Sequence, residues 1–121
     1  MPRIAIIDDE QDILNILERY LSKNGYDIQT FSNPQNGLSA VKSGNYDLLL
    51  LDIMMPTLDG ISLLKDLHNS GNKTKVMMMT AFDTLERSIE AHKFGASNYI
   101  TKPFKSLDVV KSKIEDILSE E

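Results

Sequence analysis

The chain has 121 residues, of which 41% are hydrophobic and 26% are charged, a balance typical of one globular domain with its own core. It contains no cysteine, which excludes disulfides, thiolate catalysis and cysteine-ligated zinc; no apolar run approaches membrane length, so we expect a cytoplasmic protein without membrane association. The net charge of −5 lies entirely in residues 1–60, with 4 basic and 9 acidic residues, which favours a cation over nucleic acid as a ligand.

Strand-like and helix-like stretches alternate along the whole chain. Short apolar or alternating runs predict the strands, and apolar residues at helical spacing predict the helices between them. Pro34 and Ser106 fit helix starts, whereas Gly25 and Gly95 fit helix ends. The predicted strands are 3–7, 26–31, 46–51, 75–80 and 98–101, and the predicted helices are 10–24, 36–43 after a start at Pro34, 61–67, 84–94 and 106–119.

Five strand–helix repeats predict an α/β fold with one parallel sheet. Residues 48–51 are four consecutive leucines, which is typical of a strand buried on both faces. We therefore expect a five-stranded, doubly wound parallel sheet with helices on both faces.

Polar residues collect where the predicted strands end, and ligands of open α/β sheets bind at that edge. Asp8 and Asp9 follow the first strand, Asp52 the third, Thr80 ends the fourth and Lys102 follows the fifth. Converging carboxylates repel one another unless a cation lies between them, and an all-oxygen set favours Mg²⁺ or Mn²⁺. One carboxylate oxygen could then act as a nucleophile toward a phosphoryl group, whose charge the metal and the lysine would neutralise.

The motifs in their order resemble the receiver domain of two-component response regulators. They are Asp-Asp after the first strand, a single Asp after the third, Met-Pro and Asp-Gly downstream, Thr-Ala after the fourth and Lys-Pro-Phe after the fifth. The resemblance covers residues 1–121 as a single receiver domain and implies a flavodoxin-like (βα)5 fold with strand order 2-1-3-4-5. It also implies a phosphorylation-activated switch of a two-component phosphorelay, rather than an enzyme that turns over a substrate.

The resemblance implies a metal site for Mg²⁺ or Mn²⁺ beside the acceptor. Asp9 and Asp52 would be direct ligands, Asp8 would act through water, and the backbone carbonyl of Met54 would complete the set.

The resemblance also implies roles around the phosphoryl group. Asp52 would be the phosphoacceptor for a sensor histidine kinase or a phosphotransfer protein, and Lys102 would contact the phosphoryl group. Thr80 would be the switch hydroxyl and Tyr99 the switch aromatic. The Lys102–Pro103 peptide bond is expected to be cis.

Each of these residues, taken alone, has an ordinary structural explanation. Asp8 and Asp9 could favour a helix amino terminus, Lys102 could be a solvated surface lysine, and Tyr99 could pack in its strand. His68 and His92 lie on predicted helices without a partner pattern, and we assign both to the surface.

The expected output surface is the face of residues 84–94, 98–101 and 106–119, which a downstream partner or a second copy of the chain would bind. The chain ends about where the fold is expected to end. It is therefore a stand-alone receiver or a receiver from a longer protein. We expect no direct nucleic-acid binding by this chain, because acids alternate with the lysines of the last helix.

Three other functions stay open at this point. A Mg²⁺-dependent phosphohydrolase with Asp52 as nucleophile would typically need a second Asp two residues later, where Met54 stands. A non-phosphorylated binding module need not keep the acidic pair, the acceptor, the threonine and the lysine. A flavodoxin-type cofactor protein is disfavoured, since Asp-Asp-Glu-Gln would repel a phosphate after the first strand.

The side chains at Met54 and Phe82 predict a long-lived phosphorylated state. In receivers these two positions flank the phosphoryl group, and both are large and apolar here. A bulky apolar rim hinders in-line attack by water, so we expect the phosphoryl group to persist for minutes or longer. Its decay can be followed by intact mass after removal of the donor, and a half-life of seconds would contradict the prediction.

Overall fold

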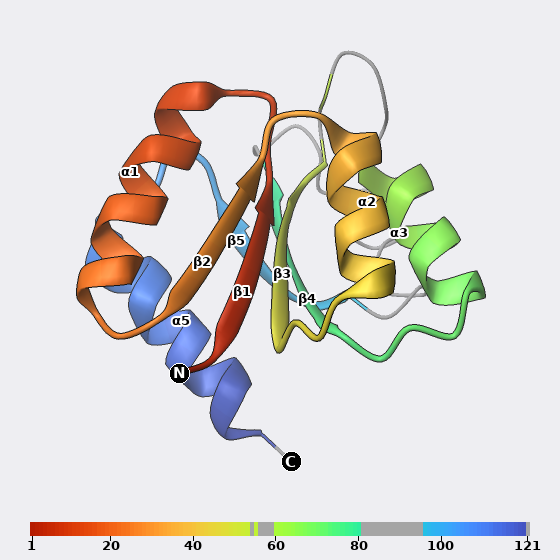
Figure 1. The fold of residues 1–121 in the computed structure, drawn as a ribbon. Coiled ribbons are helices and arrows are strands. Elements are labelled where there is room, and N and C mark those ends of the chain that lie inside the picture. Colours follow the sequence, from red (N-terminus) through yellow and green to blue (C-terminus); the bar gives the residue numbers. More distant parts are fainter. Residues whose placement is uncertain (54, 56–59, 81–95, 121) are drawn as a thin grey trace.

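The structure is a computed structural model that describes residues 1–53, 55, 60–80 and 96–120 (Figure 1). The strands are β1 (Arg3–Ile7), β2 (Asp27–Phe31), β3 (Leu48–Asp52), β4 (Lys75–Thr80) and β5 (Ala96–Thr101). The helices are α1 (Gln11–Lys23), α2 (Pro34–Ser43), α3 (Gly60–Asn69) and α5 (Leu107–Ser119). The helix predicted at 84–94 lies outside the described residues.

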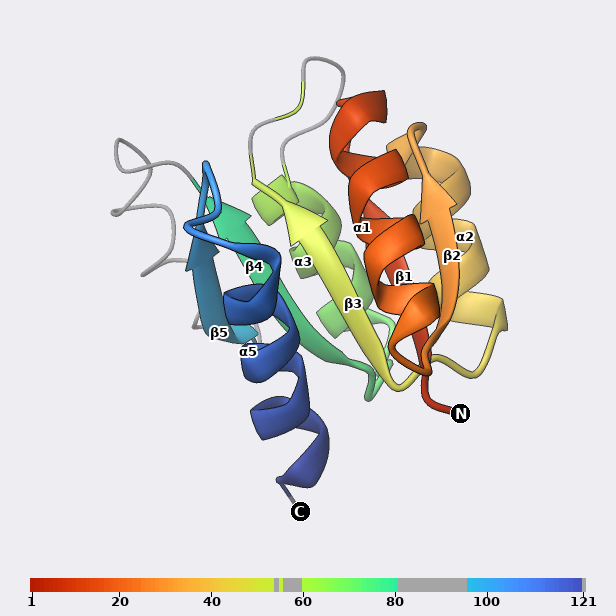
Figure 2. The ribbon, with the colours of Figure 1, turned by 90° about the vertical axis from the view of Figure 1, so that its left-hand side faces the viewer.

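The five strands form one parallel sheet in the order β2-β1-β3-β4-β5. Helices α1 and α5 cover one face of this sheet, and α2 and α3 cover the other (Figures 1 and 2). The predicted doubly wound α/β fold and its strand order are therefore confirmed. None of the helices in the described ranges is long and apolar enough to cross a bilayer.

The central strand β3 is buried on both faces, as its leucines predicted. Leu48 and Leu50 pack in the core beneath α1 and α5, whereas Leu49 and Leu51 pack in the core beneath α2 and α3. This alternation follows from the two-residue period of a strand. All four side chains are fully buried, and each contributes about 1.5–3 kcal/mol of hydrophobic stabilisation.

Four strand ends differ from the sequence prediction. Strand β2 begins at Asp27 rather than at Tyr26, whose N–H donates to the carbonyl of Leu21 at 3.2 Å, and β3 ends at Asp52 rather than at Leu51 because Asp52 pairs with Met79. Strand β3 begins at Leu48 rather than at Tyr46, because Asp47 bonds the start of β1 instead: its backbone N–H donates to the carbonyl of Arg3 at 2.8 Å, and its side chain accepts from the N–H of Arg3. Strand β5 begins at Ala96 rather than at Asn98, because Ala96 pairs with β4 across a register shift.

The helix starts predicted at Pro34 and Ser106 and the stop predicted at Gly25 are confirmed, whereas α1 is one residue shorter at each end than predicted and α3 extends from residue 60 to 69 rather than from 61 to 67. Asn33 caps α2 by accepting hydrogen bonds from the backbone N–H groups of residues 35 and 36, and Pro34 is the first helical residue. Ser106 caps α5 through the N–H of Val109 at 3.3 Å. Gly25 follows α1 with a φ of +93°, a conformation that favours glycine.

Gly60, the first residue of α3, contacts the backbone at the end of β3. Its N–H donates to the carbonyl of Ile53 at 2.8 Å, and a Cβ on residue 60 would lie 2.2 Å from the carbonyl oxygen of Asp52. Backbone atoms on a buried strand have little room to move away. Glycine at this position therefore allows α3 to begin directly beside Asp52.

We predict that Gly60→Ala destabilises the protein by about 2 kcal/mol or more, because the added methyl group overlaps backbone. Urea unfolding followed by circular dichroism measures this loss. Ser62→Ala, at an exposed position of the same helix, is the matched control and should change stability by less than about 0.5 kcal/mol. Equal stability of the two variants would contradict the close approach.

Candidate functional site

The carboxyl edge of the sheet brings together side chains from three strand ends. Asp8 directly follows β1, Asp52 is the last residue of β3, and Lys102 directly follows β5. Strands β1 and β3 are parallel neighbours with Ile7 opposite Leu51, so Asp8 and Asp52 leave the sheet side by side. The parallel register thus places residues that are far apart in the sequence at one point.

The ammonium group of Lys102 lies among three carboxylates. Its Nζ is 2.5 Å from Oδ2 of Asp8, 3.3 Å from Oε1 of Glu10 and 3.4 Å from Oδ2 of Asp52. Asp8 is fully buried and Asp52 is only 4% exposed. A buried carboxylate is costly unless a cation or hydrogen-bond donors compensate it, and Lys102 supplies both.

Opposing effects set the pKa of the Lys102 ammonium. Burial alone would lower this pKa, but the hydrogen bond with Asp8 and the charges of Asp52, Asp8 and Glu10 raise it above the ordinary value of 10.5. A lysine with a raised folded-state pKa contributes its full stabilisation below the unfolded-state value and loses it only as pH rises through the folded-state value. Lys102 therefore stays charged throughout the neutral range.

Backbone hydrogen bonds hold the Asp8 carboxylate in place. Its Oδ1 accepts from the backbone N–H of Glu10 at 2.9 Å, while its own N–H donates to the carbonyl of Phe31 at the end of β2 at 3.2 Å. Each Asp8 carboxylate oxygen thus has a donor, one from the backbone and one from Lys102.

The oxygen atoms of this site fit a hard divalent cation. One carboxylate oxygen from each of Asp8, Asp9, Glu10 and Asp52 can be chosen so that all four lie within 4.8 Å of one another. The Lys102 ammonium contacts three of these acids and compensates one negative charge, so the group keeps excess negative charge. An all-oxygen donor set of this charge suits Mg²⁺ or Mn²⁺.

The sequence prediction did not include Glu10 in the site. The structure places its carboxylate beside Lys102 and in the acidic group. The sequence feature that could have indicated Glu10 is its place as the third acid of the Asp-Asp-Glu run. A carboxylate at the start of a helix is, however, equally explained by its favourable interaction with the helix dipole. Only the contact with Lys102 separates the two interpretations.

The remaining predicted residues lie as follows. Thr80 ends β4 opposite Thr101, while its side chain, like Met54, Phe82 and His92, lies outside what the structure describes. Tyr99 is half-buried on β5, its hydroxyl donates to the carbonyl of Ala96 at 3.1 Å, and burial raises its pKa. The Lys102–Pro103 peptide bond is cis, as expected, and His68 is exposed on α3.

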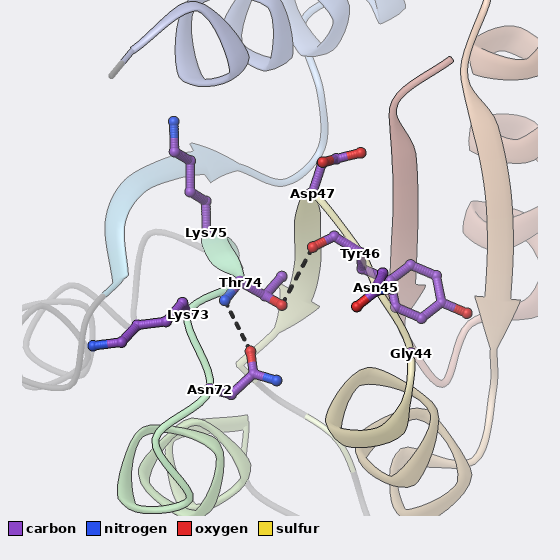
Figure 3. Close-up of a pocket in the computed structure, with 8 residues that line it drawn as sticks. All are labelled: Gly44, Asn45, Tyr46, Asp47, Asn72, Lys73, Thr74 and Lys75. Carbon is purple, nitrogen blue, oxygen red and sulfur yellow. Dashed lines mark hydrogen bonds between the residues drawn. The ribbon is translucent and has the colours of Figure 1, made fainter.

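A hollow of about 380 Å³ lies at the opposite edge of the sheet from the acidic group, between the turns that precede β3 and β4 (Figure 3). Its polar groups bond one another: Asn72 accepts from the N–H of Thr74 at 2.8 Å, and the Thr74 hydroxyl donates to the carbonyl of Tyr46 at 3.4 Å (Figure 3). Lys75 donates to the carbonyl of Ile117 at the end of α5. These contacts brace the two turns, and we therefore take the acidic edge as the functional site.

The response regulator receiver domain family model matches residues 4–114. This chain therefore belongs to that family, whose members are phosphorylation-activated switches of two-component signalling. The fold, the strand order and the acidic edge described above are those of a receiver domain.

Curated relatives include the transcriptional regulatory protein PcoR of Escherichia coli, which is 37% identical over 110 residues, 91% of this chain and 49% of PcoR. The alkaline phosphatase synthesis transcriptional regulatory protein PhoP of Bacillus subtilis is 34% identical over 116 residues, 96% of this chain and 48% of PhoP. The chain thus spans about half the length of the curated relatives it matches.

Two solved structures are similar over nearly the whole chain. The receiver domain of the Francisella response regulator 1452 superposes with a TM-score of 0.88 at 34% identity, over 98% of this chain and 97% of that one. The response regulator TrrA of Thermotoga maritima, in complex with Mg²⁺ and beryllium fluoride, gives a TM-score of 0.83 at 32% identity, over 97% and 99% of the two chains.

We predict that Lys102→Met destabilises the metal-free protein by about 3 kcal/mol, because Asp8 and Asp52 lose the cation between them. Urea unfolding measures this loss, which should be equal at pH 7 and pH 9 because the wild-type lysine is charged at both. Millimolar Mg²⁺ should restore more stability to the variant than it adds to the wild type. Lys105→Met, at an exposed position, is the control; a loss no larger than the control's would contradict the prediction.

Proposed function

We propose that residues 1–121 form a single receiver domain that accepts a phosphoryl group on Asp52 from a sensor histidine kinase or a phosphotransfer protein. The observation that carries this proposal is the place of Asp52: its carboxylate lies at the end of β3, is almost fully buried and is 3.4 Å from the Lys102 ammonium. An aspartate is a known phosphoryl acceptor when nearby cations compensate the charge.

The bonds that form and break in the proposed transfer belong to Asp52 and the phosphoryl donor. A carboxylate oxygen of Asp52 attacks the phosphorus of a phosphohistidine, a P–O bond forms, and the histidine nitrogen leaves with the electron pair of the broken P–N bond. Lys102 compensates the charge of the phosphoryl oxygens from its place beside Asp52. The product is an aspartyl-phosphate, and slow attack of water on its phosphorus would release inorganic phosphate.

The same acids would hold Mg²⁺ or Mn²⁺ during this step. We assign Asp9 and Asp52 as direct ligands, Asp8 as a ligand through water and the Met54 carbonyl as the last protein ligand. When bound, the metal would supply positive charge next to the transferring phosphoryl group. The Lys102 ammonium, which contacts Asp8, already supplies one positive charge to this group of acids.

Strand pairing suggests how phosphorylation of Asp52 could change the conformation of residues on β4 and β5. Asp52 lies opposite Met79, the residue before Thr80, and Tyr99 lies opposite Met78 on the far side of β4. We propose that the Thr80 hydroxyl moves toward the phosphoryl group and that Tyr99 changes its position in response. Residues 98–101 and 106–119, together with 84–94, would then present an altered face to a downstream partner or to a second copy of the chain.

The phosphorylated form is proposed to act as a signal, not as a step of an enzymatic cycle. A phosphohydrolase on this scaffold would need an acid or base two residues after Asp52, where the apolar Met54 stands. We propose that the domain acts in the cytoplasm and binds no nucleic acid itself. Its output would pass to a separate partner or to a domain outside this chain.

The test is intact mass after incubation with acetyl phosphate or phosphoramidate, with and without Mg²⁺. We expect the wild type to gain one phosphoryl group only with Mg²⁺, Asp52→Ala to gain none, and Asp66→Asn, an exposed acid on α3, to gain one as the wild type does. No gain by the wild type despite measured Mg²⁺ binding would favour a pure binding module. Rapid release of phosphate over many turnovers would favour the hydrolase.

A further inference from the structure

We propose that Glu10 is a positioning residue that holds the Lys102 ammonium in the unphosphorylated state and thereby sets the balance between cation and phosphoryl binding. Its Oε1 lies 3.3 Å from Nζ of Lys102. The Glu10 side chain is 60% exposed, whereas Asp8 and Asp52 are buried. Lys102 therefore lies between two buried carboxylates and an exposed one.

The helix that follows does not need the Glu10 side chain. Glu10 precedes the first residue of α1, and its side chain makes no capping hydrogen bond. Its backbone N–H donates to Asp8 and its carbonyl accepts from the N–H of Leu14 at 3.2 Å, contacts that any residue can make. The carboxylate reaches instead toward Lys102, which is 92 residues away in the sequence.

The charge of Glu10 has opposite effects on the two ligands of the site. A divalent cation gains attraction from a fourth carboxylate. A phosphoryl group on Asp52 must draw Lys102 away from Glu10, and the carboxylate left behind repels the phosphoryl oxygens. This inference rests on the proposed phosphoryl acceptance at Asp52. It adds that Glu10 favours the metal-bound, unphosphorylated state.

Three variants separate charge from contact. Glu10→Gln keeps the shape and removes the charge, whereas Glu10→Asp keeps the charge and shortens the reach to Lys102. Asp12→Asn removes an exposed acid in the first turn of α1 that is outside the acidic group. Mg²⁺ affinity is measured by calorimetry, and binding of BeF₃⁻, an anion that occupies the place of a phosphoryl group, is measured by fluorine NMR in saturating Mg²⁺.

We expect Glu10→Gln to weaken Mg²⁺ binding and to tighten BeF₃⁻ binding, each by about two- to fivefold, the range of a partly exposed ion pair. Glu10→Asp should keep the wild-type Mg²⁺ affinity and still tighten BeF₃⁻ binding, since only the contact with Lys102 is lost. Asp12→Asn should change neither affinity. The proposal would be overturned if Glu10→Gln changed the Mg²⁺ and BeF₃⁻ affinities in the same direction. It would also be overturned if Asp12→Asn changed these affinities as much as Glu10→Gln does.

A third readout keeps this test independent of phosphoryl chemistry. The ¹³Cε resonance of Lys102 in the ligand-free protein should move in Glu10→Gln and stay unchanged in Asp12→Asn. An unmoved resonance in Glu10→Gln refutes the role of Glu10. If the resonance moves while the wild type binds no BeF₃⁻, the positioning contact stands and the proposed acceptor function of Asp52 fails.

Discussion

The ion pair between Lys102 and the buried carboxylate of Asp8 is the contact on which the functional edge depends. Parallel strands bring their carboxyl ends to one edge, so Asp8, which follows β1, and Asp52, which ends β3, lie side by side. Two nearly buried carboxylates repel each other there unless a positive charge lies beside them. Lys102 follows β5, on the far side of β4, and its ammonium provides a positive charge beside both carboxylates.

The rest of the fold holds this charged group in place. The four leucines of β3 anchor the strand in both cores, so that Asp52 ends a rigid element rather than a loop. Gly60 lets α3 start against the backbone of the same residue. Burial on both faces of the sheet thus fixes the surroundings of Asp52.

Much of this arrangement could be predicted from the sequence, because hydrophobic runs and strand ends carry most of the information. The leucine run predicted a strand buried on both faces, and parallel strands then implied that Asp8, Asp52 and Lys102 meet. The start predicted for β3 was wrong because the Asp47 side chain accepts a hydrogen bond from the backbone N–H of Arg3, a residue distant in the sequence. Glu10 was missed for the same reason, since its partner Lys102 lies at the other end of the chain.

The most direct test of the central claim is to locate the phosphoryl group itself. Borohydride reduces an aspartyl-phosphate to homoserine, and fragmentation mass spectrometry of the phosphorylated, reduced chain then identifies the modified position. We expect homoserine at position 52 alone, because the Asp52 carboxylate ends β3, is only 4% exposed and lies 3.4 Å from the Lys102 ammonium, with the acids of residues 8–10 beside it. Homoserine at position 8 or 9, or phosphate bound elsewhere on the chain, would contradict it.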